Sequence, residues 1–168
     1  YDRVFHCSLE NNSGKGAALR KGFKKAIELE PDFTVTIDAD LQHPPAYIPN
    51  LLAEIKNYDI IIGSRRRDFR KMPVQRIISN YLTSKLLSIK TGQKIPDSQS
   101  GFRVYKTGIL KDLFPVNNGF EAESEMLIFA SRKKYKIGSV LIPTIYGNDN
   151  SKMKSVQAIK GFIKVLFS

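Results

Sequence analysis

The feature that most constrains the fold is an alternating stretch that follows directly on a helical one. Residues 33–40, F-T-V-T-I-D-A-D, alternate apolar and polar side chains, which is the pattern of a β-strand with one buried face. The preceding residues 16–29 carry apolar side chains at helical spacing among basic ones, and Pro31 ends them. A strand entered directly from an amphipathic helix is typical of an α/β domain.

The same alternation of helix and strand continues along the chain. Further helices are predicted over residues 47–56, 74–89, 123–135 and 156–167, and further strands over 4–7, 59–63, 102–105 and 137–146. We therefore expect residues 1–168 to form a single α/β domain with a largely parallel sheet. A chain of 168 residues is long enough to bury a core of its own.

The charge of the chain indicates the kind of partner it binds. The 27 Lys and Arg outnumber the 16 Asp and Glu, which favours nucleic acid, acidic lipid headgroups or phosphorylated small molecules. Cys7 is the only cysteine, so an intramolecular disulfide is excluded and a reducing cytosol is the expected setting. The sequence has no apolar run of ~18 residues and no signal-peptide pattern.

Asp38 and Asp40 are the first candidate site residues. The alternation places both on one face at the carboxyl end of a strand, where ligands bind in open α/β sheets. Two like charges this close favour a bound cation, and carboxylate oxygens with open coordination positions suit Mg²⁺ or Mn²⁺ bridging to a phosphate. Gln42 and His43 are near enough to add a ligand or a supporting hydrogen bond. The alternative, that both aspartates are turn or helix-capping residues, stays open.

Six motifs then follow one another along the chain. They are N-N-S-G-K-G-A-A-L-R-K-G-F, D-A-D-L-Q-H-P, G-S-R, D-S-Q-S-G-F-R, G-F-E-A-E-S-E and I-Y-G-N-D-N-S-K. In this order they resemble the inverting nucleotide-sugar glycosyltransferases of the GT-A fold, and most of all the dolichol-phosphate mannosyltransferase-like branch. The resemblance implies metal-dependent transfer of a sugar from a GDP-mannose or UDP-glucose type donor to a polyprenyl phosphate, by a protein at the cytosolic face of a membrane.

The resemblance also implies roles for particular residues. Asp38, Asp40 and Gln42 match the positions that hold the metal ion and the donor diphosphate, and Asp40 counts among the catalytic residues. Glu123 and Glu125 match acids that orient the acceptor or stabilise positive charge on the sugar; alternatively they are favourable acids at a helix N-terminus. The positions that match binding sites for donor, sugar or acceptor phosphate are Lys15, Asp38, Arg65, Arg76, Ser79, Arg103, Ser151 and Lys152.

One departure from the family concerns the nucleotide pocket. The P-x-x-N-E and V-D-D-G-S motifs of the family's first two strands, which bind the base and ribose, are absent. We therefore expect a catalytic domain that lacks its first strands, and whether such a piece is active alone stays open.

Several alternatives remain beside this interpretation. The same fold transfers sugars to polysaccharides in other branches, but the Q-x-x-R-W signature of processive synthases is absent and the chain has no Trp. The basic run over residues 65–71 raises nucleic-acid binding, yet no helix-turn-helix or zinc pattern accompanies it, so no nucleic-acid partner is expected. A non-catalytic binding module stays open for the piece, as does a homo-oligomer. The basic amphipathic helix over 156–167 fits either a membrane surface or the domain core.

Overall fold

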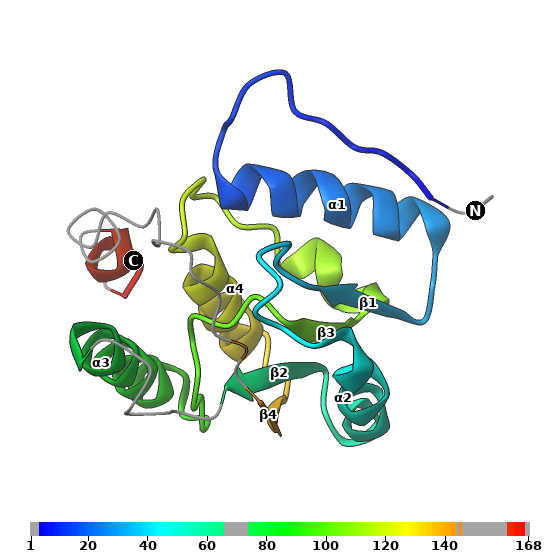
Figure 1. Cartoon of the computed structure of the whole chain (residues 1–168). Helices are drawn as coiled ribbons and strands as arrows, with labels where there is room; N and C mark the ends of the chain where they lie inside the picture. Colours follow the sequence, from blue (N-terminus) through cyan, green and yellow to red (C-terminus); the bar gives the residue numbers. More distant parts are fainter. Residues whose placement is uncertain (1–3, 66–73, 144, 146–160, 167–168) are drawn as a thin grey trace.

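A four-stranded sheet lies at the centre of the molecule, with helices on both of its faces (Figure 1). The computed structural model describes residues 4–65, 74–143, 145 and 161–166, without the side chains of residues 74–76. The strands are β1 (Phe33–Thr36), β2 (Ile60–Arg65), β3 (Arg103–Lys106) and β4 (Ile137–Ile142). The α-helices are α1 (Lys15–Leu29), α2 (Ile48–Glu54), α3 (Val74–Thr91) and α4 (Ala122–Arg132). Short 3₁₀ helices are η1 (Pro45–Tyr47), η2 (Ile55–Asn57) and η3 (Thr107–Asp112).

The strands are ordered β1-β3-β2-β4 across the sheet. β3 pairs antiparallel with both β1 and β2, whereas β2 and β4 pair in parallel. β1, β2 and β4 therefore run in one direction, and β3 is inserted between two of them in the other. The sheet is thus mixed: three of its strands share one direction, as expected, and β3 is antiparallel to both of its neighbours.

The alternation of side chains along β2 divides the core in two. Ile60 and Ile62 face a larger cluster that includes Phe23 of α1, Leu87 of α3 and Met126 of α4. Ile61 faces the opposite side, where Leu51 of α2 and Ile55 of η2 cover the sheet. A strand buried on both faces explains why its sequence is an unbroken apolar run rather than an alternating one.

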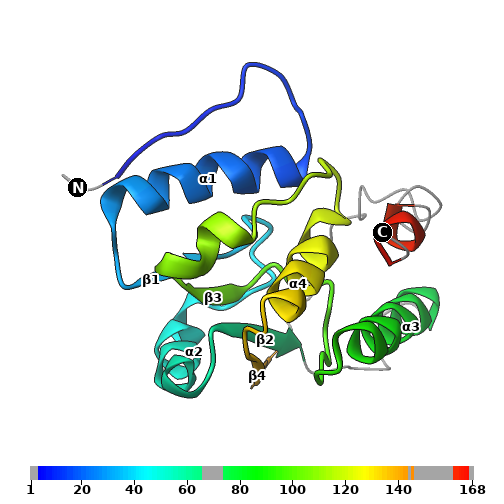
Figure 2. The same ribbon diagram turned by 180° about the vertical axis from the view of Figure 1, so that it is seen from behind.

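The helices expected from periodicity are confirmed within the described residues, but three expected strands differ, one of which, expected over 137–146, ends at Ile142. Residues 4–9 form no strand; Val4 and Phe5 are exposed, and the segment passes beside α1 without a pairing neighbour (Figure 2). The strand that begins at Phe33 ends at Thr36 rather than at Asp40. Asp38 follows the strand, and Asp40 lies in a turn.

The last expected helix is described only over residues 161–166, and this part contacts the domain core. Residues 161–166 are helical, and Phe162 and Val165 are buried in the larger core cluster. This turn therefore packs on the domain. Among the described residues, no helix combines the length and the apolarity needed to cross a bilayer.

Candidate active site

Lys15, Asp38 and Glu123 meet at one side of the sheet although they come from three separate segments. The Lys15 ammonium lies 2.8 Å from Oδ1 of Asp38 and 2.9 Å from Oε2 of Glu123. Lys15 is the first residue of α1, Asp38 follows β1, and Glu123 is in the first turn of α4. Burial by itself lowers the pKa of Lys15, but the charges of Glu123 and Asp38 outweigh it, so the pKa lies above its ordinary value. The ammonium is therefore fully charged.

Two glycines on either side of Lys15 fix its position. A Cβ on Gly14 would overlap the carbonyl oxygen of Asn118, and one on Gly16 would overlap that of Asn117. Gly14 also has φ 89°, which favours glycine. The amide of Gly16 donates to the Asn118 carbonyl oxygen at 2.8 Å. The start of α1 is thus set directly against the loop before α4.

Glu125 organises that loop and lies away from Lys15. Its Oε2 accepts the amides of Val116 and Asn117 at 2.8 and 3.0 Å, and its Oε1 accepts Nδ2 of Asn117 at 2.9 Å. Arg20 of α1 closes the loop from the other side by donating to the Pro115 carbonyl oxygen at 2.8 Å. Glu125 is 5 % exposed. Glu125 therefore supports the loop against which α1 begins, a role that the motif alone did not indicate.

Asp40 and Gln42 belong to a turn, which corrects the expected strand. Oδ1 of Asp40 accepts the amide of Gln42 at 3.0 Å, and Leu41 between them has φ 61°. This is an Asx-type turn, in which a short acidic side chain closes the backbone two residues on. Asp40 is exposed, whereas Asp38 is partly buried beside Gly101, where any Cβ would overlap its carboxylate. The two carboxylates therefore do not share a strand face.

His43 lies behind this turn. It is 3 % exposed, packs against the Phe102 ring at 5.8 Å between centroids, and neither ring nitrogen has a hydrogen-bond partner. Burial and the nearby Arg65 charge lower its pKa, so the imidazole is neutral. The charges of Asp38 and Asp40 act in the opposite direction, but burial and Arg65 outweigh them.

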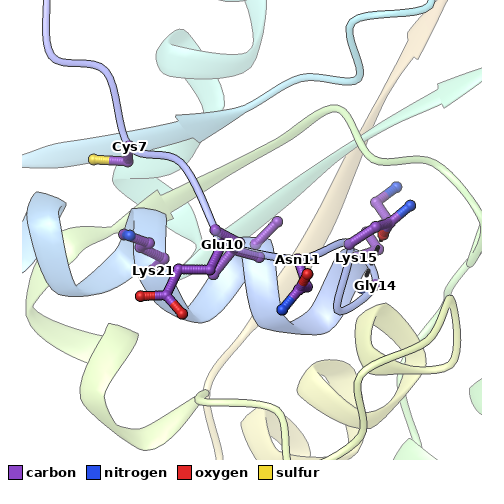
Figure 3. Close-up of a pocket in the computed structure, with 9 residues that line it drawn as sticks. Cys7, Glu10, Asn11, Gly14, Lys15 and Lys21 are labelled. Atoms are coloured by element: carbon purple, nitrogen blue, oxygen red, sulfur yellow. Dashed lines mark hydrogen bonds between the residues drawn. The ribbon is translucent and has the colours of Figure 1, made fainter.

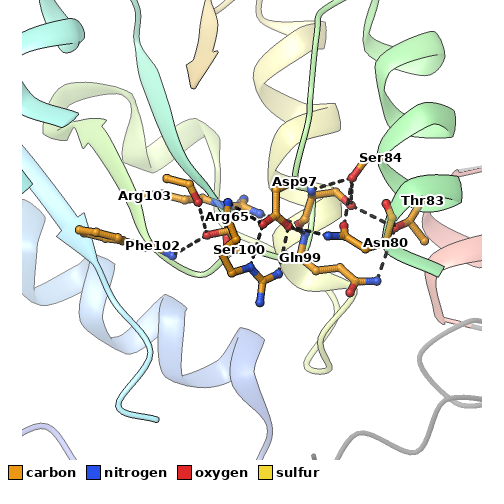
Figure 4. A network of polar contacts seen from close by, with 11 residues as sticks. Arg65, Asn80, Thr83, Ser84, Asp97, Gln99, Ser100, Phe102 and Arg103 are labelled. Atoms are coloured by element: carbon orange, nitrogen blue, oxygen red, sulfur yellow. Dashed lines mark hydrogen bonds and ion pairs between the residues drawn. The ribbon is translucent and has the colours of Figure 1, made fainter. Parts of the chain in front are cut away.

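Arg65 ends β2 and is held by an acid that the sequence interpretation assigned no role. Asp97 pairs with it through Nε at 2.8 Å and Nη2 at 3.0 Å (Figure 4). Burial raises the pKa of Asp97, but the hydrogen bonds and charge of Arg65 outweigh burial and lower it. The quoted motif D-S-Q-S-G-F-R contained this aspartate, but only a long-range contact reveals its partner.

Arg103 is placed beneath the site rather than in it. Its guanidinium is fully buried and donates to the carbonyl oxygens of Ser100, Glu123 and Ser98, each at 2.9 Å. These bonds tie the end of the S-G-F-R motif to the first turn of α4. The geometry therefore favours a supporting role over direct contact with a sugar.

The remaining candidate residues lie on or beyond α3. Ser79 is partly buried on α3, one residue before Asn80, whose side chain contacts Asp97 at 3.1 Å. The backbone of Arg76 is helical, but its side chain is outside the description. Ser151, Lys152 and most of the basic run over 65–71 also lie outside the described residues.

Two pockets border Lys15. One, of about 540 Å³, lies between α1 and residues 7–12 and is lined by Cys7, Glu10, Asn11, Gly14, Lys15 and Lys21 among others (Figure 3). The other, of about 400 Å³, lies between α1 and β1 and includes Phe23, Thr36 and Asp38. Lys15 thus lines both pockets, and Asp38 lines the second one with it.

Solved structures with a similar backbone identify the fold of this domain. Over 96 % of its length the chain superimposes, with a TM-score of 0.70 and 20 % identity, on 57 % of glucosyl-3-phosphoglycerate synthase from Mycobacterium tuberculosis in complex with phosphoglyceric acid. The same enzyme with Mn²⁺ and UDP-glucose gives a TM-score of 0.68 at 19 % identity, over 96 % of this chain and 56 % of that one. The fold is the GT-A fold of glycosyltransferases.

Sequence relatives identify the family. Residues 1–114 match the family model described as glycosyl transferase family 2, and the chain belongs to that family. It is 35 % identical over 167 residues to a UDP-N-acetylglucosamine–dolichyl-phosphate N-acetylglucosaminyltransferase of Methanococcus voltae, covering 95 % of this chain and 66 % of that protein. It is 31 % identical over 135 residues to an undecaprenyl-phosphate mannosyltransferase of Micrococcus luteus, covering 77 % of this chain and 56 % of that protein. The chain thus spans somewhat less than two thirds of these relatives.

Proposed function

We propose that the protein containing this chain transfers a sugar, with inversion, from a nucleotide-diphosphate sugar to a polyprenyl phosphate at the cytosolic face of a membrane. The observation that carries the proposal is the convergence of Lys15, Asp38 and Glu123. A fixed ammonium beside a carboxylate pair suits a departing diphosphate, because charge accumulates on the leaving phosphate and is stabilised most in the transition state.

The donor set near Asp38 fits a divalent ion held with substrate. No cluster of three His, Cys, Asp or Glu side chains suited to a closed metal site occurs among the described residues. Asp38, Asp40 and Gln42 instead offer hard oxygen donors within five residues of chain after β1, two of them carboxylates, which suits Mg²⁺ or Mn²⁺ that keeps positions for phosphate oxygens. When bound, such an ion neutralises charge on the diphosphate.

The chain's own residues take three roles in this proposal. Lys15 binds the diphosphate and holds the carboxylates of Asp38 and Glu123 close to each other. Glu123, buried and carrying its charge toward the site, orients the acceptor or stabilises positive charge at the anomeric carbon. Arg65 binds phosphate; because a phosphate monoester is already an anion at neutral pH, its positioning matters more than a strong general base.

The exposed face of α3 supports a membrane-bound acceptor. Ile78, Leu82 and Ile89 recur at helical spacing and are 59 %, 53 % and 71 % exposed. The helix carries Arg76, Lys85 and Lys90 and no acidic residue. An exposed apolar face on a basic helix is typical of a helix that lies on an anionic membrane surface. We therefore propose an acidic lipid surface as its partner.

The names of the relatives agree with this acceptor. Those from Methanococcus voltae and Micrococcus luteus are named for dolichyl phosphate and undecaprenyl phosphate. One solved structure of glucosyl-3-phosphoglycerate synthase is a complex with Mn²⁺, UDP and phosphoglyceric acid. These complexes and names support a nucleotide-sugar donor and a divalent metal cofactor for this chain.

The test follows labelled sugar from donor to product. Full-length protein in membranes receives radiolabelled UDP- or GDP-sugars with Mg²⁺ or Mn²⁺. Label in an organic-extractable product that mild acid releases supports transfer to a polyprenyl phosphate. Label found only in polymer rejects the lipid acceptor in favour of a glycan, and no transfer with any donor supports a non-catalytic domain.

A further inference from the structure

Asp97 connects the end of β2 to the middle of α3. The aspartate is 2 % exposed and lies in the segment between α3 and β3. Its Oδ2 accepts both the backbone amide of Arg65 at 3.2 Å and Nε of the same residue at 2.8 Å, while Oδ1 accepts Nη2 at 3.0 Å. Two parallel bonds to a guanidinium fix its plane as well as its position.

The same carboxylate also holds the helix. Oδ1 of Asp97 accepts Nδ2 of Asn80 at 3.1 Å, and Oδ1 of Asn80 in turn accepts the Ser84 hydroxyl at 3.1 Å. Ser84 then accepts the amide of Ser98 at 2.9 Å, which brings the network back to the segment that carries Asp97. Figure 4 shows this network running from Arg65 across to α3. Every link is buried except the outer part of Arg65.

A buried carboxylate adds little net stability, because the cost of removing it from water offsets most of its attraction to the guanidinium. A shared carboxylate nevertheless fixes two elements relative to each other. One element ends in Arg65, and the other carries Ser79 one residue from Asn80. Arg65 is the residue that the proposed function assigns to phosphate, and Ser79 lies on the same helix as the exposed side chains of Ile78 and Leu82.

We propose that Asp97 is a positioning residue for the acceptor: it fixes the Arg65 guanidinium relative to α3, so that the two form one subsite for the phosphate of a prenyl phosphate. This inference rests on the proposed function and deepens it. In the proposed function the donor diphosphate binds Lys15 and the residues at Asp38 and Asp40, none of which has a hydrogen bond to Asp97 in the structure. Disturbing Asp97 therefore affects acceptor binding more than donor binding.

The test is a comparison of steady-state constants for both substrates. Full-length wild-type and Asp97→Asn proteins in detergent micelles are assayed with a short-chain prenyl phosphate and the nucleotide sugar that serves the wild type. We expect the acceptor KM to rise about tenfold or more, since small misplacement of a binding group is costly, while the donor KM stays within about twofold. Loss of folded protein lowers kcat and leaves both KM values unchanged, so the split separates positioning from instability.

Asp59→Asn is the matched control. Asp59 precedes β2 at its opposite end and also accepts a charged side chain, Lys106, at 2.8 Å and a backbone amide, that of Lys136, at 2.8 Å. It lies away from Arg65, so neither KM changes. Asn80→Ala is the second variant, used if Asp97→Asn does not fold. It cuts only the link to α3, and the acceptor KM is expected to rise about fivefold, the worth of one hydrogen bond.

The outcomes separate this inference from the proposed function. Wild-type protein that uses a glycan instead of a prenyl phosphate overturns the proposed acceptor, and the assignment of the subsite with it. A wild type that uses prenyl phosphate, with unchanged acceptor KM in Asp97→Asn and Asn80→Ala, overturns the positioning role alone. An equal rise in both KM values also overturns it.

Discussion

The Lys15 ammonium lies 2.8 Å from a carboxylate oxygen of Asp38, so the first residue of α1 is joined to the turn that follows β1. Glu123 shares the same ammonium at 2.9 Å, with a side chain that is only 6 % exposed. One lysine therefore serves two acids of different chain segments, and neither the helix nor the turn can shift without breaking a charged contact.

Replacing Lys15 by Met tests this arrangement. We expect the variant to lose most of its affinity for nucleotide sugar. Its free energy of unfolding should fall by about 1–3 kcal/mol, because Glu123 is left buried without its charged partner. Isothermal titration with nucleotide sugar and urea unfolding measure the two effects. Lys25→Met is the control, because its bond to Glu28 is on the surface and is worth about 0–1 kcal/mol. Unchanged nucleotide-sugar affinity in Lys15→Met would remove Lys15 from the donor site.

Much of the fold followed from periodicity, and the turn at Asp40 did not. The helices and the buried strand at residues 60–65 carry strong local patterns, which packing reinforced. The alternation of residues 33–40 continued past Thr36, yet the strand stops there. Asp40 instead closes a turn with its own side chain, a local bond that competes with strand pairing and that alternation does not encode.

The candidate site shows the same division. Its motif residues were identified from sequence, and Lys15, Asp38 and Glu123 do come together. Whether a motif residue faces substrate or supports the fold depends on long-range partners. Arg103 and Glu125 bond to backbone groups, and Asp97 acquires its meaning only from Arg65 and Asn80, which are distant in sequence.

Asp40→Ala separates metal binding from folding. Asp40 is exposed and makes one bond to the amide of Gln42, so the free energy of unfolding falls by only about 0.5–1.5 kcal/mol. Mn²⁺-dependent transfer is expected to fall at least about 100-fold, and Mn²⁺ binding measured by electron paramagnetic resonance weakens with it. Asp32→Asn, a change at another exposed aspartate, leaves both unaffected. Retained turnover in Asp40→Ala contradicts its place among the metal ligands.

Two glycines of α1 provide a matched pair. A Cβ on Gly16 would overlap the Asn117 carbonyl oxygen and lie 2.9 Å from Cβ of Ala122, so Gly16→Ala forces α1 away from the loop before α4. We expect a loss of about 1–3 kcal/mol together with weaker donor binding, because Lys15 moves with the helix. Gly22→Ala meets nothing within 4 Å and stabilises the helix by about 0.5–1 kcal/mol. Equal stability of the two variants would contradict the tight contact at Gly16.

The pH dependence of stability reports the Asp97 pair. Its pKa is lowered in the folded protein, so the unfolded chain takes up a proton first, near the ordinary value of 3.8. The contribution of ionised Asp97 to the free energy of unfolding is therefore fully present above pH 3.8, and it is lost as the pH falls toward the pKa of the folded protein. Urea unfolding from neutral pH to about pH 3 should show a shallower acid loss in Asp97→Asn than in the wild type. Identical slopes would mean that Asp97 is not ionised in the folded protein.

Arg103→Lys tests whether this arginine supports the site or contacts a sugar. The fully buried guanidinium donates to the carbonyl oxygens of Ser98, Ser100 and Glu123. A lysine ammonium does not have the planar arrangement of donors that reaches all three. At least about 2–3 kcal/mol of stability is expected to be lost, since buried acceptors are left without donors. Folded variant protein should keep the donor KM of the wild type. The opposite result, normal stability with a raised donor KM, would return Arg103 to the sugar pocket and require its side chain to leave the carbonyl groups it now holds.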